Sequence, residues 1–259
     1  MEYESFSQMM VSLALVLPRI AAAFILLPHF STDTIPPLVR NIFFVSLSLA
    51  LVPLILEAPP PAELKGVALA PLVLKEAFIG IAIGYTFGIV FWALEGAGQI
   101  IDNKIGSTTA QLVDPITGHQ TTLIGAYLGR LAAYVFAAFG GLHLFTDLLL
   151  STFNVWPVLD PLPSLPAVGQ MFFVQRFDDL MRLALLLAAP VLCVLSLLEF
   201  GLGFVNRYAP QLNVFSLSMA IKGWLAVFVL VLSVGSMGQF ILEQIAGGRV
   251  FLEQIPIGR

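Results

Sequence analysis

The hydrophobic residues of this chain gather in six long apolar runs that are separated by polar or proline-rich breaks. A helix that crosses the roughly 30 Å hydrocarbon core of a bilayer needs about 20 mostly apolar residues, and the runs approach that length. They are Met9–Pro28, Ile42–Leu56, Val67–Leu94, Leu123–Thr146, Leu183–Leu198 and Gly223–Leu242. Proline clusters such as residues 58–61 separate helices, because proline lacks a backbone N–H. The pattern predicts an all-α integral membrane bundle, with residues 1–259 as a single domain.

Composition narrows the class of protein further. Hydrophobic residues make up 58% of the 259-residue chain and charged residues 11%, whereas a soluble domain carries about 25% charged residues. The formal net charge is −4 and there is no basic run, which argues against a nucleic-acid partner. Cys193 is the only cysteine, and neither catalytic nor metal-binding motifs occur. We therefore predict a membrane protein that is not an enzyme and has no cofactor or metal.

The N-terminus begins with acidic residues, Glu2 and Glu4, where a secretory signal would carry basic ones. We therefore expect the first apolar run to be an uncleaved membrane segment. Lys and Arg residues outside the six runs divide almost evenly between the two sides. The positive-inside rule consequently gives no orientation.

Charged residues lie inside the apolar runs at Arg19, Lys75, Glu76 and Arg130. Each ionised group at the centre of a lipid-facing helix costs about 2.5–3.5 kcal/mol on insertion scales, so these side chains should face protein or water. Two interpretations follow. The commoner one is a buried ion pair between helices, and the other is a transport pathway.

Three glycines recur at intervals of four residues in the third apolar run, at Gly80, Gly84 and Gly88. Small residues at this spacing let two helix backbones approach closely inside a membrane. The motif indicates close packing without identifying the partner. A helix of the same chain and a helix of another subunit are equally compatible with it.

The stretch Glu95–Thr122 is polar, with a narrow apolar stripe at Ile101, Ile105, Leu112 and Ile116. The spacing is that of an amphipathic helix, and Asp114-Pro115 interrupts it. We predict an amphipathic helical hairpin that begins after a break at Glu95. It could line an aqueous path, dock a partner or lie in the membrane interface.

A second unusual block, Glu199–Lys222, is rich in Gly, Asn, Gln and charge although it lies between two apolar runs. Pro210 should break or kink a helix there and free backbone carbonyls. Irregular backbone at membrane depth is tolerated only inside protein or against water. We predict a re-entrant or broken element near a pathway.

The part of this block from Asn206 to Phe215, followed by Met219 and Lys222, resembles the signature of the FliR/SctT export-gate family of type III secretion systems. Further matches occur at Pro28-His29-Phe30, Lys75-Glu76, Gly98, Ile101-Asp102 and Asp114-Pro115, so the resemblance spans nearly the whole chain. The segment from Phe215 to Lys222 looks closer to the injectisome branch than to the flagellar branch.

The resemblance implies a non-enzymatic, multi-pass subunit of an export gate in the bacterial inner membrane, with helical hairpins raised out of the bilayer plane. It implies assembly with FliP/SctR-like and FliQ/SctS-like membrane proteins and contact with an FlhB/SctU-like switch protein. Unfolded export substrates would pass through the centre. The alternative is a small secondary transporter or channel, which the embedded charges and the proline-interrupted block also suit.

Candidate contact residues follow from these patterns. Glu76, Glu199, Arg207 and Lys222 are the predicted ion-pair residues, and we expect them to fix the register of the assembly. The full set of candidate contacts between helices or subunits is Arg19, Arg40, Glu76, Gly80, Gly84, Gly88, Asp114, Glu199, Asn206, Arg207, Pro210, Gln211, Asn213 and Lys222. Phe215 and Met219 are candidates for sealing a pore, although core packing is the commoner role of such side chains.

Overall fold

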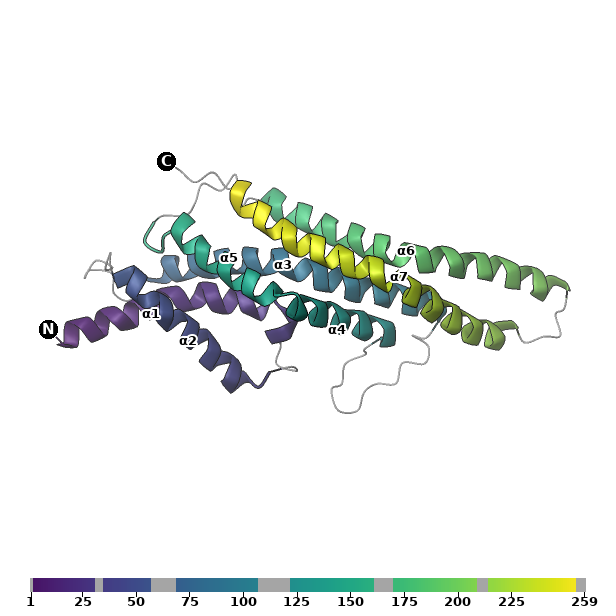
Figure 1. Ribbon diagram of the computed structural model, residues 1–259, viewed down its shortest axis with the longest axis horizontal. Helices are drawn as coiled ribbons and strands as arrows, with labels where there is room; N and C mark the ends of the chain where they lie inside the picture. Colours follow the sequence, from purple (N-terminus) through teal and green to yellow (C-terminus); the bar gives the residue numbers. More distant parts are fainter. Residues whose placement is uncertain are drawn as a thin grey trace. The chain divides into compact units, whose positions relative to one another are not determined.

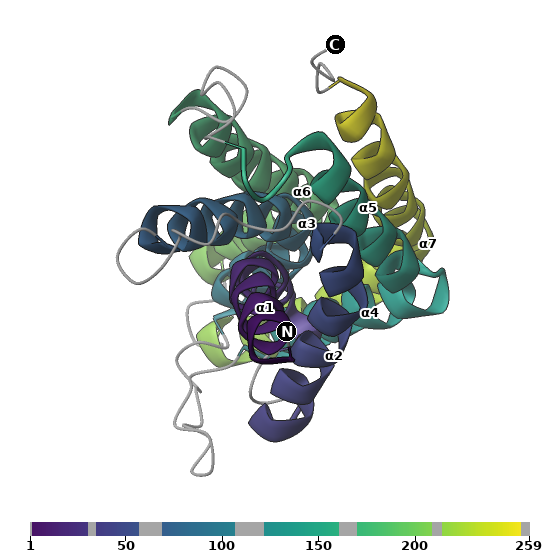
Figure 2. The same cartoon turned by 90° about the vertical axis from the view of Figure 1, so that its left-hand side faces the viewer.

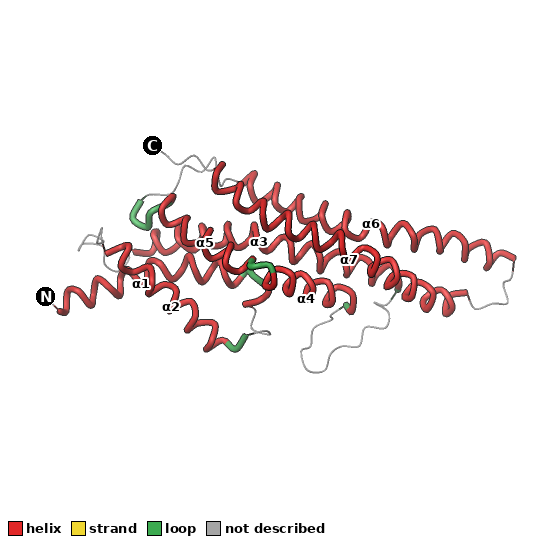
Figure 3. The backbone as a smooth tube through the Cα atoms, in the orientation of Figure 1, coloured by secondary structure: helices red, strands yellow, loops and turns green. Residues whose placement is uncertain are grey.

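The computed structural model is built from α-helices, and it describes residues 2–30, 35–56, 69–106, 122–160, 170–208 and 214–254. The elements are α1 (Glu2–Ile25), the short 3-10 helix η1 (Pro28–Phe30), α2 (Pro37–Leu56), α3 (Ala70–Ile105), α4 (Leu123–Ala138), α5 (Gly141–Val155), α6 (Gln170–Tyr208) and α7 (Val214–Gln254) (Figure 1). Figure 3 shows no strand among the described residues. The predicted all-α fold class is confirmed.

The chain divides into two compact units. Unit 1 contains residues Met1–Gly88, Gly140–Arg176 and Gly247–Arg259, and unit 2 contains Ile89–Phe139 and Phe177–Ala246. Helices α3, α6 and α7 each contribute to both units. The single domain over residues 1–259 stays a prediction.

Four helices in the described part of the chain are long and apolar enough to cross a membrane: Gln8–Ile25, Ala70–Ile105, Met171–Tyr208 and Leu217–Ile241. The bent pair α4 and α5 would make a fifth span if both helices belong to one crossing. Helix α2 has a shorter apolar stretch, Pro37–Pro53. The protein is therefore a membrane protein, with fewer clear spans than the six apolar runs.

The apolar run Leu123–Thr146 is divided into two helices instead of forming one. Helices α4 and α5 meet at an angle of 72°. The turn passes through Gly140, whose φ of 74° lies in the left-handed region that a residue without a Cβ adopts at little cost. A hydropathy pattern does not reveal this turn, because the helices on both sides of it are apolar.

The predicted break at Glu95 is wrong, because α3 continues without interruption to Ile105. Glu95, Gln99 and Asn103 are exposed along this last part of the helix, whereas Ile101 and Ile105 are buried. The amphipathic pattern is therefore real, but it extends the apolar helix instead of starting a new one. The remaining stripe residues, Leu112 and Ile116, lie outside the described residues.

Helices α6 and α7 also extend well beyond the apolar runs that predicted them, to 39 and 41 residues. The block Glu199–Lys222 is helical on both sides, since α6 ends at Tyr208 and α7 begins at Val214. Pro210 and its neighbours, where the break was predicted, lie outside the described residues.

An aromatic cluster forms the centre of unit 1. The ring centroid of Phe24 on α1 lies 4.8 Å from that of Phe30, 5.3 Å from that of Phe43 on α2 and 5.0 Å from that of Phe145 on α5, each pair edge-on. Edge-to-face pairs of this kind add about 0.5–1.5 kcal/mol beyond their buried area. They join α1, α2 and α5, and Figure 2 shows α1 beside α2 in the view turned by 90°.

Helix α1 also approaches α3 closely in unit 1, because two glycines of α3 leave no side chain between the backbones. A Cβ atom on Gly80 would overlap the carbonyl oxygen of Arg19, and one on Gly84 would overlap that of Ala23. The four-residue steps of the two helices therefore match. At Gly80 and Gly84 the close packing takes place within the chain itself.

We expect Gly84→Ala to lower the free energy of unfolding by about 1–3 kcal/mol, because the added methyl group would push α1 away from α3. Gly235→Ala on α7 is the matched control, since a Cβ there meets nothing within 4 Å and alanine has the better helix propensity. The measurement is denaturant unfolding of the purified protein in detergent micelles, followed by circular dichroism. Equal stability of the two variants would contradict the close α1–α3 contact.

Candidate functional site

The side chain of Arg19 on α1 is fully buried in unit 1 and forms a bidentate ion pair with Glu76 on α3. Its Nε lies 2.5 Å from Oε2 of Glu76, and its Nη2 lies 2.9 Å from Oε1. Glu76 is fully buried as well. Two parallel hydrogen bonds fix the orientation of both planes, which a single lysine contact would not do. This pair therefore sets the rotation of α1 about its axis relative to α3.

Two cations, Arg19 on α1 and Lys75 on α3, donate to backbone carbonyls that follow the C-terminal end of α5. Nη2 of Arg19 donates to the carbonyl of Trp156 at 2.8 Å. Nζ of Lys75 donates to the carbonyls of Pro157, Val158 and Asp160, at 3.1, 2.7 and 3.0 Å. Trp156 is the C-cap residue of α5, and the other three carbonyls belong to the segment that follows it. Arg19 and Lys75 consequently attach the end of α5 to α1 and α3.

Two further contacts surround the guanidinium of Arg19. Its Cζ lies 4.0 Å from the ring centroid of Phe153, a cation–π geometry. Its Nη1 lies 3.3 Å from Oγ1 of Thr152. The Nζ of Lys75 is also 3.0 Å from Oε1 of Glu76, so one carboxylate serves two cations. We call Arg19, Lys75 and Glu76 the buried charge cluster.

Unit 2 contains a second charge cluster, which is partly exposed. Glu199 on α6 accepts hydrogen bonds from Lys104 in the last turn of α3 and from Lys222 on α7, the latter at 2.6 Å. The side chains of Lys104 and Glu199 are 32% and 36% exposed. Ion pairs with this exposure contribute about 0–1 kcal/mol each. These ion pairs fix the arrangement of three helices more than they add to stability, because one carboxylate on α6 contacts both α3 and α7.

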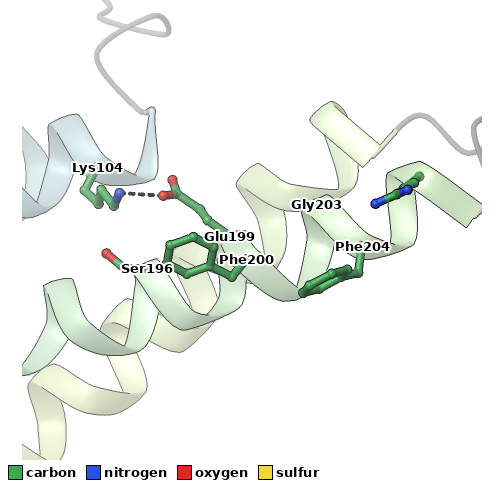
Figure 4. A pocket seen from close by; sticks show the side chains of 7 residues that line it. Lys104, Ser196, Glu199, Phe200, Gly203 and Phe204 are labelled. Carbon is green, nitrogen blue, oxygen red and sulfur yellow. Dashed lines mark hydrogen bonds and ion pairs between the residues drawn. The ribbon is translucent and has the colours of Figure 1, made fainter.

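A pocket of about 510 Å³ opens beside this second cluster. It is lined by Lys104, Ser196, Glu199, Phe200, Gly203, Phe204 and Arg207. Figure 4 shows Lys104 reaching across to Glu199 at one end, with the rings of Phe200 and Phe204 along α6. The pocket thus combines charged and aromatic side chains.

Asp102 joins α3 to α4 in unit 2. Its Oδ2 accepts hydrogen bonds from the backbone N–H groups of Ile124 and Gly125, at 2.8 and 3.2 Å. Thr122, the N-cap residue of α4, makes no side-chain cap bond of its own. A carboxylate at a helix N-terminus satisfies free N–H groups and complements the helix dipole. The close contact of Gly98 with Gly125 permits this approach.

The structure brings some of the predicted contact residues together. Arg19, Glu76, Gly80 and Gly84 lie at the α1–α3 contact. Glu199 and Lys222 meet in unit 2. Arg207 lines the pocket, and the adjacent Asn206 is exposed. Of the embedded charges, Arg19, Lys75 and Glu76 form the buried ion pairs that were the commoner of the two interpretations.

Other predicted residues lie apart or cannot be placed. Arg40 donates to the carbonyl of Phe30 at 3.4 Å. Gly88 lies within α3, and Arg130 is exposed. Of the pore-sealing candidates, the Cε of Met219 faces Gly106, and Phe215 lies in the first turn of α7 without a described side chain. Asp114, Pro210, Gln211 and Asn213 lie outside the described residues.

Sequence reasoning missed three polar residues as contact residues: Lys104, Asp102 and Thr152. Lys104 had a usable signal, because a basic residue in the last turn of a helix complements the dipole of that helix and so marks its C-terminal end. The hydrogen-bond partners of Asp102 and Thr152 are far away in the sequence, so no local pattern of residues predicts these contacts. The described residues contain no group of three or more side chains that could hold a metal ion.

Comparison with known proteins identifies the class. A family model described as bacterial export proteins, family 1, matches residues 10–247. The chain is 35% identical to the Yop proteins translocation protein T of Yersinia pestis over 86% of this chain and 85% of that protein. It is 33% identical to the surface presentation of antigens protein SpaR of Salmonella typhimurium, over 89% and 85% of the two chains.

The flagellar biosynthetic protein FliR of Bacillus subtilis is 30% identical over 80% of each chain. The residues that the family model matches include those of both charge clusters. This chain therefore belongs to the family of bacterial export proteins that includes FliR and SpaR. The resemblance to FliR/SctT proteins is confirmed.

We expect Glu76→Gln to lower the free energy of unfolding by about 3–5 kcal/mol, because Arg19 and Lys75 would stay buried without a counter-charge. Glu95→Gln is the matched control, since Glu95 is an exposed carboxylate on the same helix and its loss should change stability by less than about 0.5 kcal/mol. Denaturant unfolding in detergent micelles measures both. A Glu76→Gln variant as stable as the control would show that the cluster carries no structural role.

Proposed function

We propose that this protein is a structural subunit of the export gate of a type III secretion system, in the bacterial inner membrane. In this role it helps to form the channel through which unfolded substrates leave the cytoplasm. It acts without catalysis and without a cofactor. The observation that carries the proposal is the family match over residues 10–247, together with relatives that are named for translocation, secretion and flagellar biosynthesis.

The partners follow from the same proposal. The gate subunit would assemble with FliP/SctR-like and FliQ/SctS-like membrane proteins and engage an FlhB/SctU-like switch protein. The Yop translocation protein and SpaR match at 35% and 33% identity over 86% and 89% of this chain, whereas the flagellar proteins of Bacillus subtilis and Escherichia coli match at 30% and 33% over 80% and 56%. This difference favours the injectisome branch.

The unequal burial of the candidate membrane helices within the chain supports a role as a subunit of an assembly. In an apolar 18-residue window of α3, 67% of the residues are buried within the chain, but in the corresponding window of α7 only 11% are. Trp224, Phe228, Val231 and Leu232 on α7 are all more than half exposed. Exposed apolar surface of this extent is typical of interaction sites and of lipid contact. An assembly of several membrane proteins would bury much of it.

The structure also explains the features that suggested a transporter. Three of the four embedded charges are paired with one another inside unit 1, so they do not require a substrate pathway. The remaining embedded charge, Arg130, is exposed on α4. No specific observation favours the transporter over the gate subunit.

The test is co-expression of the tagged chain with its genomic neighbours, purification in mild detergent and native mass spectrometry. We expect a discrete complex that contains one copy of this chain and several copies of two other small membrane proteins. Expression of the neighbours is checked in the membrane fraction, so that their absence from the complex is meaningful.

Recovery of the chain only as a monomer or homo-oligomer, with the neighbours present in the membrane, would contradict the gate assignment and favour a transporter. A secretion assay in cells that lack the chain then provides the second readout. The gate subunit predicts that export stops in the deletion strain and returns with the parental chain.

A further inference from the structure

The last turn of α6 ends in a cation whose counter-charge is not within the described part of the chain. Arg207 is exposed and lines the pocket of unit 2, but it forms no ion pair with any described residue. Helix C-termini attract cations, yet the dipole alone does not explain why Arg207 borders a pocket.

The charges around the pocket do not balance. Among the described side chains that line the pocket, Glu199 is the one anion, and Lys104 and Arg207 are the cations. One positive charge is therefore in excess, and the Glu199 carboxylate is also shared with Lys222, outside the lining. An occupant of complementary charge must therefore be anionic.

Beside its charged residues, the pocket is lined by two aromatic and two small residues. Phe200 and Phe204 are 71% and 64% exposed, whereas Ser196 and Gly203 provide little side-chain volume. A Cβ atom on Gly203 would meet nothing within 4 Å. The positions 196, 200, 203 and 207 recur at helical spacing, so they form a groove along one face of α6.

The spacing of two arginines on α6 fits the thickness of a bilayer. Arg182 and Arg207 are 25 residues apart on α6, which is about 37 Å of α-helix. Exposed apolar side chains occupy the interval, including Leu185, Leu186 and Leu197. The hydrocarbon core is about 30 Å thick, and about 40–45 Å with the headgroups. The largely apolar interval, which also contains Glu199, is thus long enough to cross the hydrocarbon core with the two arginines at the level of the headgroups.

We propose that this pocket binds the phosphate headgroup of an anionic phospholipid, with the acyl chains along the apolar face of α6. Arginine forms paired hydrogen bonds with phosphate oxygens, and basic pockets between membrane helices suit anionic headgroups. The volume of about 510 Å³ lies within the usual range of ligand sites, about 300–1,000 Å³. This inference goes beyond the gate function and does not depend on it.

A phospholipid contacts both parts of the site: its headgroup binds at the excess positive charge, and its acyl chains lie along the adjoining apolar face of α6. A soluble anion would use only the charge and would leave Phe200 and Phe204 exposed. The competing occupant is an acidic side chain of another subunit, and the experiment below separates the two.

The test uses the full chain, delipidated in neutral detergent and titrated in native mass spectrometry. The probes are phosphatidylglycerol, phosphatidylethanolamine with the same acyl chains, and inorganic phosphate. We expect phosphatidylglycerol to bind at least fivefold more tightly than phosphatidylethanolamine, and inorganic phosphate at equal concentration not to displace it.

Two variants locate the site, each with a matched control on the same helix. Arg207→Gln should weaken phosphatidylglycerol binding about fivefold, the usual contribution of one basic residue near an anionic lipid surface. Gly203→Leu should weaken it at least as much by filling the groove without a change of charge. Arg182→Gln and Gly201→Leu alter an equivalent charge and an equivalent glycine outside the pocket, and both should bind like the parent.

Circular dichroism of each variant verifies that the helices are intact. Equal affinity for the two phospholipids would overturn the proposal, and so would unchanged phosphatidylglycerol binding by both Arg207→Gln and Gly203→Leu. Displacement by inorganic phosphate would overturn the lipid identity of the ligand. Loss of other subunits from co-purified complexes of Arg207→Gln, with unchanged lipid binding, would assign the counter-charge to a partner protein instead.

Discussion

The bidentate ion pair between Arg19 and Glu76 is the interaction on which the arrangement of unit 1 depends. It joins the C-terminal half of α1 to α3 in an apolar environment, where unpaired charges are costly. One turn further along α3, Gly80 admits the backbone carbonyl of Arg19 itself, so the ion pair and the glycine contact require the same register. Arg19 and Lys75 then hold the carbonyls after α5. A single polar cluster consequently positions three helices that are otherwise joined by non-directional apolar contacts. Such a cluster specifies one orientation of the helices, whereas apolar packing alone buries surface without a preferred direction.

Unit 2 is organised differently. Its charge cluster is partly exposed, and the contact with a directional role is the Asp102 carboxylate at the N-terminus of α4. Apolar surface on α6 and α7 stays largely uncovered by the chain itself. Unit 1 thus satisfies its own buried charges, while unit 2 presents helix faces, a cationic pocket and exposed aromatic side chains to its surroundings. A subunit of a membrane assembly combines these two properties, an internally fixed part and a part that other molecules complete.

The sequence allowed the existence and type of the elements to be predicted, but not their ends or their partners. Apolar runs of about 20 residues predict helices because only a helix satisfies its backbone in an apolar medium. The polar residues after Leu94 were misread as a break, although they are the exposed face of a continuing helix. The turn at Gly140 could not be predicted from hydropathy, because both flanking helices are apolar. Arg19 and Glu76 were recognised as anomalous, yet their pairing spans 57 residues, and local periodicity contains no information at that distance. The resemblance to the family was recognised mainly from one polar block, Asn206 to Phe215. Its unusual residues are specific to the family, whereas apolar residues are common to all membrane helices.

A double-mutant cycle between Arg19 and Glu76 tests most directly whether their ion pair determines the α1–α3 contact. The free energy of unfolding is measured in detergent micelles for the parent, Arg19→Leu, Glu76→Leu and the double variant. If the pair is the determining interaction, each single change is strongly destabilising, and the double variant is more stable than at least one of the single variants, with a coupling energy above about 2 kcal/mol. Additive effects of the two substitutions would contradict this account, because they would show that the two side chains contribute to stability independently of each other.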